Sequence, residues 1–169
     1  MAGVLDGIRV LDFGRFIAGP FAATILGDLG ADVIRIERID GGEDRWTVPV
    51  TTDGQGALFL QVGRNKKSVT LNPMKDKGRE IMNNLIKTAD IVIANLPPET
   101  RKQMGLDYPT LKAIKANLIV STVTCFGSGG PFSDRVGFDG LAQAMSGAMY
   151  MTGPEAVSYT HLTLPTIYS

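Results

Sequence analysis

The stretch LDGIRVLDFGRFIAGPFAATILGDLGADVIRIER, residues 5–38, decides the fold. Its apolar run at residues 8–13 is typical of a parallel strand that is covered on both faces. Apolar side chains then recur at helical spacing from Pro20, which suits the first turn of a helix, to Gly30, which is placed to end it. Residues 33–38 predict a second strand, so the stretch reads as a β-α-β unit.

The second predicted strand closes with Glu37 and Arg38. In a nucleotide-binding β-α-β unit this strand end meets the ribose, where an acidic residue suits a free 2′-hydroxyl and an arginine suits a ribose phosphate. Arg38 therefore points to a phosphorylated ribose. The alternative is a solvated arginine at a strand end.

The rest of the chain continues the alternation of strands and helices. We expect strands at residues 68–71, 90–96 and 118–124, helices at 57–62, 75–88, 106–116 and 139–149, and a loop at 40–56. Asp107 and Asp139 are placed to cap the last two helices. This pattern predicts an α/β fold with a doubly wound (Rossmann-like) parallel sheet.

Composition narrows the function classes. The 17 basic and 17 acidic residues cancel, so no broad field favours nucleic acid or an anionic membrane. The single cysteine, Cys125, cannot form an internal disulfide, which suits a reducing compartment. No apolar run approaches the roughly 20 residues that span a bilayer, and no signal peptide is evident. We expect a cytoplasmic protein that binds neither nucleic acid nor membrane.

The carboxyl-terminal residues 157–166, VSYTHLTLPT, match the in-frame translation of a transposase-type sequencing adapter. We therefore expect residues 157–169 to be a non-native, artefactual tail, and residues 1–156 to be an incomplete amino-terminal α/β domain. The only histidine, His161, lies in this tail. Histidine catalysis and histidine metal sites are thus excluded for residues 1–156, and no metal site is predicted.

Residues 5–38 also resemble the amino terminus of the family III CoA-transferases, such as the formyl-CoA and carnitine CoA-transferases. The likeness continues through NKKSVTLN (65–72), ADIVIANLPP (89–98) and CFGSGGPFSDRVGFDGLAQAMSGAM (125–149). The resemblance implies a truncated CoA-transferase large domain that binds coenzyme A. Coenzyme A carries a 3′-phosphate on its ribose, which agrees with the independent interpretation of Arg38.

The resemblance implies a CoA site at the strand ends, with backbone at residues 15–18 lining the channel, residues 71–74 at the adenine and residues 95–97 at the pantetheine arm. A purely structural turn at residues 14–19 and a solvated helix-start lysine at Lys75 are the alternatives for two of these positions. The candidate CoA-binding residues are Ile17, Ala18, Arg38, Leu71, Asn72, Met74, Lys75, Asn95, Leu96, Arg101 and Phe138.

The implied reaction moves CoA from an acyl-CoA donor to a carboxylic acid through an anhydride on an aspartate nucleophile. No aspartate follows Asp139, so we expect the nucleophile beyond residue 156 and no turnover by this chain alone. Acyl-CoA serves as substrate, no covalently bound cofactor is implied, and relatives form interlocked homodimers. An acyl-CoA racemase or epimerase is a first alternative, although such enzymes have a histidine where Phe138 stands. The second is a non-catalytic nucleotide-binding module.

Overall fold

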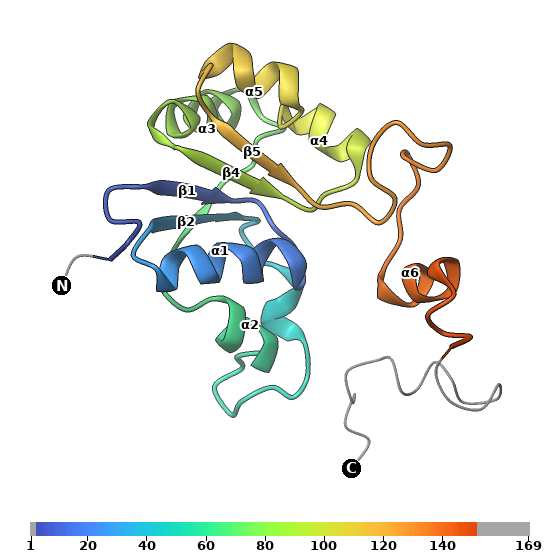
Figure 1. Ribbon diagram of the computed structural model, residues 1–169. Coiled ribbons are helices and arrows are strands. Elements are labelled where there is room, and N and C mark those ends of the chain that lie inside the picture. Colours follow the sequence, from blue (N-terminus) through green and yellow to red (C-terminus); the bar gives the residue numbers. More distant parts are fainter. Residues whose placement is uncertain (1–2, 152–169) are drawn as a thin grey trace. The chain divides into compact units, whose positions relative to one another are not determined.

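The structure is a computed structural model and describes residues 3–151. The chain divides into two units, residues 1–123 and 124–169. The first unit holds a five-stranded sheet with helices on both faces (Figure 1).

Every neighbouring pair of strands in the sheet is parallel, in the order β3-β2-β1-β4-β5. The strands are β1 (Arg9–Asp12), β2 (Asp32–Glu37), β3 (Lys66–Thr70), β4 (Ile91–Ala94) and β5 (Ile119–Thr122). The chain builds outward from β1 to β3 and then crosses back to β4, so the strand order reverses between β1 and β4. This arrangement confirms the predicted doubly wound sheet, and such a reversal is where ligands bind in open α/β sheets.

The helices of the first unit divide between the two faces of the sheet (Figure 1). One face carries α1 (Ala18–Asp28) and α2 (Ala57–Val62), and the other carries α3 (Asp76–Thr88), α4 (Pro98–Met104) and α5 (Tyr108–Ile114). Adjacent residues of one strand serve opposite faces, since Val10 packs in the cluster with Ala23 of α1, whereas Leu11 packs in the cluster with Met82 of α3.

Most predicted elements are confirmed, and Asp107 caps α5 by accepting a hydrogen bond from the Thr110 amide (3.1 Å). Two elements were missed. The segment 40–56, predicted as a plain loop, contains the short 3₁₀ helix η1 (Glu43–Trp46) and an isolated bridge between Val50 and Gly56. Helix α4 was missed because its start, Pro97-Pro98, directly follows the predicted strand at residues 90–96, although proline is also favoured in the first turn of a helix.

The second unit contains α6 (Asp139–Ser146) after an irregular segment. The predicted cap is wrong here: Phe138 occupies the capping position, where it makes no side-chain capping hydrogen bond. Asp139 lies in the first turn, where its carboxylate accepts from the side-chain amide of Gln143. A carboxylate in the first turn still favours the helix dipole. The predicted artefactual tail, residues 157–169, lies outside the described residues.

Candidate functional site

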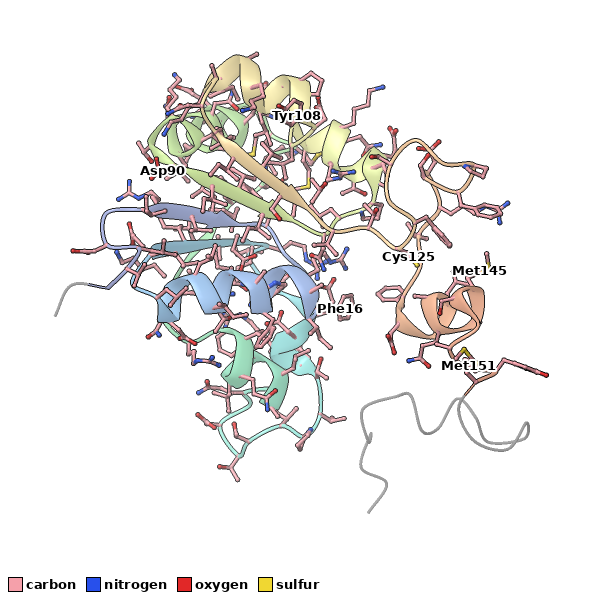
Figure 2. All side chains as sticks on the ribbon, in the orientation of Figure 1. Phe16, Asp90, Tyr108, Cys125, Met145 and Met151 are labelled. Atoms are coloured by element: carbon pink, nitrogen blue, oxygen red, sulfur yellow. The ribbon has the colours of Figure 1, made fainter. Side chains whose placement is uncertain are left out.

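A cleft of about 670 Å³ opens at the edge of the sheet where the strands end. Figure 2 marks the two edges: Asp90 precedes β4 at one of them, and Phe16 follows β1 at the other. The cleft is lined by Phe13–Arg15 after β1, Arg35–Glu43 at the end of β2 and beyond, Thr70–Met74 at the end of β3 and beyond, and Leu96, Thr100 and Met104. Four strand ends thus converge on one cavity.

The turn between β1 and α1 forms one wall of the cleft. Phe16 adopts a left-handed conformation (φ 56°), which is unusual for a residue with a side chain. Asn95, after β4, holds the turn: its Oδ1 accepts from the Arg15 amide (2.6 Å), and its Nδ2 donates to the Arg15 carbonyl (2.7 Å). The amide therefore bridges the point where the strand order reverses and fixes a strained backbone.

Two arginines in the cleft share one carboxylate. The Arg15 guanidinium contacts Glu43 with two nitrogens, one of them Nε to Oε2 at 3.0 Å. Arg38, whose side chain is 70% exposed, reaches Glu43 Oε1 through Nη2 at 3.4 Å. Burial would raise the pKa of Glu43, but hydrogen bonding to Arg15 and the charges of Arg15 and Arg38 lower it below its ordinary value.

A buried ion-pair cluster fixes the segment after β2. Arg35 donates two hydrogen bonds to Asp44 (2.7 and 2.5 Å), and both side chains are almost fully buried. Glu37 accepts from Arg45, Ser68 and the Gly42 amide. Burial alone would raise the pKa of Glu37, but these hydrogen bonds and the nearby Arg35 and Arg45 charges lower it to about 2.

This cluster decides which residue at the end of β2 can meet a ligand. The Glu37 carboxylate is fully engaged by protein donors, so it has little capacity left for a ribose hydroxyl. The Arg38 guanidinium, by contrast, is solvent-exposed beside the cleft. The residues present thus favour an anionic group at this strand end.

A second buried pair supports the β1–α1 turn. Lys66 Nζ contacts Asp12 Oδ2 at 2.7 Å and also donates to the Pro20 carbonyl (2.6 Å). The other Asp12 oxygen accepts from the Gly14 amide (2.8 Å). Strand β3 is in this way tied to the start of α1 across the sheet.

The structure brings five of the predicted CoA-binding residues together in the cleft wall: Arg38, Leu71, Asn72, Met74 and Leu96. Within the segment after β3, Asn72 Oδ1 accepts from the Met74 amide (3.0 Å), which shapes the backbone proposed to meet the adenine.

The other six predicted residues do not line this cleft. Ile17 and Lys75 are exposed just before α1 and α3, and Ala18 is exposed as the first residue of α1. Asn95 is engaged with the Arg15 backbone. Arg101 lies in α4, and its Nε is buried without a hydrogen-bond partner within residues 3–151. Phe138 belongs to the second unit. Roles in CoA binding for these six residues stay predictions.

Sequence reasoning missed the side chains of Arg15 and Glu43. Arg15 was considered only for its backbone, and Glu43 lay in a segment without periodicity. The sequence did offer one signal, the charged Glu43 directly after the glycine pair Gly41-Gly42 that follows a strand end. A motif of three residues is too short to predict which arginine this carboxylate pairs with.

Among residues 3–151, no helix is long and apolar enough to cross a membrane. The same part of the chain contains no group of three or more metal-ligating side chains that could hold a metal ion.

Curated relatives align with nearly the whole chain. It is 42% identical over 152 residues to the succinyl-CoA:glutarate CoA-transferase of Mus musculus, covering 89% of this chain and 35% of that protein. It is 40% identical over 151 residues to the alpha subunit of the succinyl-CoA–L-malate CoA-transferase of Chloroflexus aurantiacus, covering 88% and 35%. The chain therefore spans about a third of the length of these relatives.

Solved structures give the same picture. A CAIB/BAIF family protein from Brucella suis superposes with a TM-score of 0.84 at 39% identity, covering 90% of this chain and 42% of that one. The protein Rv3272 from Mycobacterium tuberculosis superposes with a TM-score of 0.82 at 37% identity, covering 91% and 43%.

The family model for CoA-transferase family III matches residues 5–168. The match covers the four sequence blocks that carried the resemblance, and the relatives share the fold as well as the sequence. The chain belongs to CoA-transferase family III.

Proposed function

We propose that the complete protein is a CoA-transferase that moves coenzyme A from an acyl-CoA donor to a carboxylic acid, and that residues 3–123 bind the CoA. The observation that carries this proposal is the exposed Arg38 guanidinium at the end of β2, in a cleft formed by four strand ends of a family III chain.

The cleft suits the nucleotide end of coenzyme A. Arg38 offers a planar cation to the ribose 3′-phosphate, which lysine would not match in geometry. We assign the backbone of residues 71–74 to the adenine and Leu96, just after β4, to the pantetheine arm. All of these residues line the cleft. A cleft that is mostly apolar with a few charged groups is typical of cofactor sites.

The proposed chemistry needs a carboxylate nucleophile, which we place beyond residue 156. An aspartate carboxylate attacks the donor thioester, the carbon–sulfur bond breaks, and CoA leaves as thiolate with formation of a mixed anhydride. The thiolate then attacks the aspartyl carbonyl and releases the donor acid, leaving an aspartyl-CoA thioester. The acceptor carboxylate repeats the sequence in reverse, so the aspartate and CoA are regenerated without an added cofactor.

The first substrates to test are succinyl-CoA and dicarboxylic acids. The two curated relatives described above, at 42% and 40% identity, are named for succinyl-CoA with glutarate or L-malate. We therefore propose a donor and an acceptor of this class for the complete protein.

The test is an assay of the complete gene product with succinyl-CoA and glutarate or malate, in which new acyl-CoA is measured by chromatography. We expect a new thioester to form in proportion to the succinyl-CoA consumed. Proton exchange at the α-carbon without transfer would instead identify a racemase. Neither reaction, with CoA still bound, would identify a non-catalytic binding module.

The purified 169-residue chain should give no turnover in the same assay, because we place the nucleophile beyond residue 156. Measurable transfer by that chain would refute this placement. Sequencing the source DNA past codon 156 tests the artefactual tail directly: we expect the open frame to continue into native sequence. We also propose a cytoplasmic, interlocked homodimer for the complete protein, which light scattering would show as twice the chain mass.

A further inference from the structure

The Glu43 carboxylate forms ion pairs with both arginines that line the cleft, Arg15 and Arg38. Its carboxylate is contacted by two nitrogens of Arg15 and by Nη2 of Arg38, and all three residues line the cavity. A carboxylate held between two guanidinium groups stands where an anionic group of a ligand would bind.

The position of Glu43 is built into the fold. Its neighbour Asp44 is fully buried against Arg35, and the Gly42 amide donates to Glu37 (3.0 Å). A Cβ at Gly42 would collide with the Arg35 guanidinium and would lie 2.6 Å from the Asp44 carboxylate. The residues on both sides of Glu43 are therefore held in place, so its backbone is fixed and its carboxylate lies next to the two arginines.

The contacts themselves are easily released. The Arg38 side chain is 70% exposed and meets Glu43 through one nitrogen at 3.4 Å, and Arg15 is 44% exposed. An exposed pair with one contact, such as Arg38–Glu43, stabilises a fold by only about 0–1 kcal/mol. Arg38 can therefore exchange Glu43 for a more highly charged partner at small cost, and the partly exposed Arg15 guanidinium lies beside it on the same carboxylate.

We propose that Arg15 and Arg38 form a two-arginine phosphate site and that Glu43 is its internal counter-ion, displaced by the ribose 3′-phosphate of coenzyme A. The inference rests on the proposed function and adds to it a second phosphate-binding residue and a competitor. The two arginines and Glu43 together carry one net positive charge, which favours a doubly charged phosphomonoester over a singly charged carboxylate. Glu43 thereby makes the site selective for the phosphorylated ribose.

The decisive variant is Glu43→Gln, which keeps the size of the side chain and removes the competing charge. Calorimetric titration of the complete gene product should show CoA binding about threefold to tenfold tighter than in the wild type, because an anion near the ligand phosphate has been removed. Binding of dephospho-CoA should change by less than about twofold. Arg15→Gln should weaken CoA by at least about threefold.

The matched control is Glu80→Gln, which removes the same charge from an exposed position of α3 away from the cleft and should leave both affinities unchanged. Unchanged or weaker CoA binding in Glu43→Gln would overturn the competitor role and make Glu43 a residue that only orients the arginines. Unchanged CoA binding in Arg15→Gln would overturn the two-arginine site.

A second probe separates this inference from the proposed function. Inorganic phosphate should raise the melting temperature of Glu43→Gln more than that of the wild type or of Glu80→Gln. If this holds while CoA fails to bind the wild type, the phosphate site stands and the CoA-transferase proposal falls. If CoA binds but phosphate affects Glu43→Gln and the wild type equally, the counter-ion inference falls and the proposed function stands. Glu43→Ala provides the same comparison if Glu43→Gln folds poorly.

Discussion

Two arginines three residues apart in the sequence have opposite environments. Arg35, in β2, is buried against Asp44 and beside Glu37, whereas Arg38, just past the same strand, is exposed at the cleft. The two belong to different sets of charges. One is a buried cluster of Arg35, Glu37 and Asp44, joined by the half-buried Arg45, and the other pairs the exposed Arg15 and Arg38 with the half-buried Glu43. We infer that the buried cluster holds the segment after β2 and that the second set meets the ligand.

The difference in burial indicates which charges stabilise the fold and which remain available to a ligand. A buried charge must keep its partner, because separating the pair leaves an unpaired ion in an apolar environment. An exposed charge gains little from its partner and can exchange it. Variants that act on one set and spare the other test this division.

The largest effect should follow from Arg35→Met. Loss of the guanidinium leaves the Asp44 carboxylate buried without its partner, so we expect the free energy of unfolding to fall by about 3–5 kcal/mol in urea titrations. The control is Arg64→Met, since Arg64 makes a similar two-nitrogen contact with Asp28 on the surface and should cost less than about 1 kcal/mol. Equal losses in the two variants would contradict the division.

The next effect is the pH dependence of stability. The pKa of Glu37 is lowered from 4.5 to about 2 in the folded chain, so its contribution is complete above the unfolded pKa and is lost as the pH falls from about 4.5 towards 2. Urea midpoints measured between pH 7 and pH 3 should drop steeply at the acid end. The drop should be smaller in Glu37→Gln and unchanged in Glu80→Gln, and a Glu37→Gln variant with the wild-type slope would show that another group causes it.

A smaller effect should follow from Asn95→Ala. Two hydrogen bonds to the Arg15 backbone disappear, so we expect a loss of about 2 kcal/mol and weaker CoA binding through a loosened turn. Asn117→Ala, on an exposed position before β5, is the control and should change neither quantity. If Asn95→Ala lost CoA affinity at full stability, direct contact with the pantetheine arm would explain Asn95 better than a role in the turn.

The sheet could be predicted from the sequence because its signals are local. Apolar runs such as residues 8–13 mark strands, and Pro20 and Gly30 bracket the first helix, so short windows determine the order of elements. Helix α4 was not predicted because a proline that follows a strand, such as Pro98, can also be the first residue of a helix. The exposed apolar positions Phe21 and Ile25 of α1, and Leu29 just after it, could not be distinguished in the sequence from the buried face of the helix, where Ala23 and Thr24 pack.

The sequence predicted only those parts of the candidate site that depend on local features of the chain. Arg38 could be proposed as a ligand contact because a strand end is itself a local feature, whereas Leu71 and Leu96 were proposed from the family resemblance. The partnership of Arg15 with Glu43 spans 28 residues and depends on the buried anchoring of Asp44, which no pattern in the sequence encodes. The role of a charged loop residue depends on such long-range contacts, which a short window of sequence does not contain.

The central claim is that Arg38 meets the 3′-phosphate of coenzyme A. Its most direct test is calorimetric titration of Arg38→Ala, in the complete gene product, with CoA and with dephospho-CoA. We expect CoA to bind about tenfold more weakly and dephospho-CoA to change by less than about twofold, with Arg64→Ala as the charge-matched control. An equal loss of affinity for both ligands, or no loss for either, would contradict the claim.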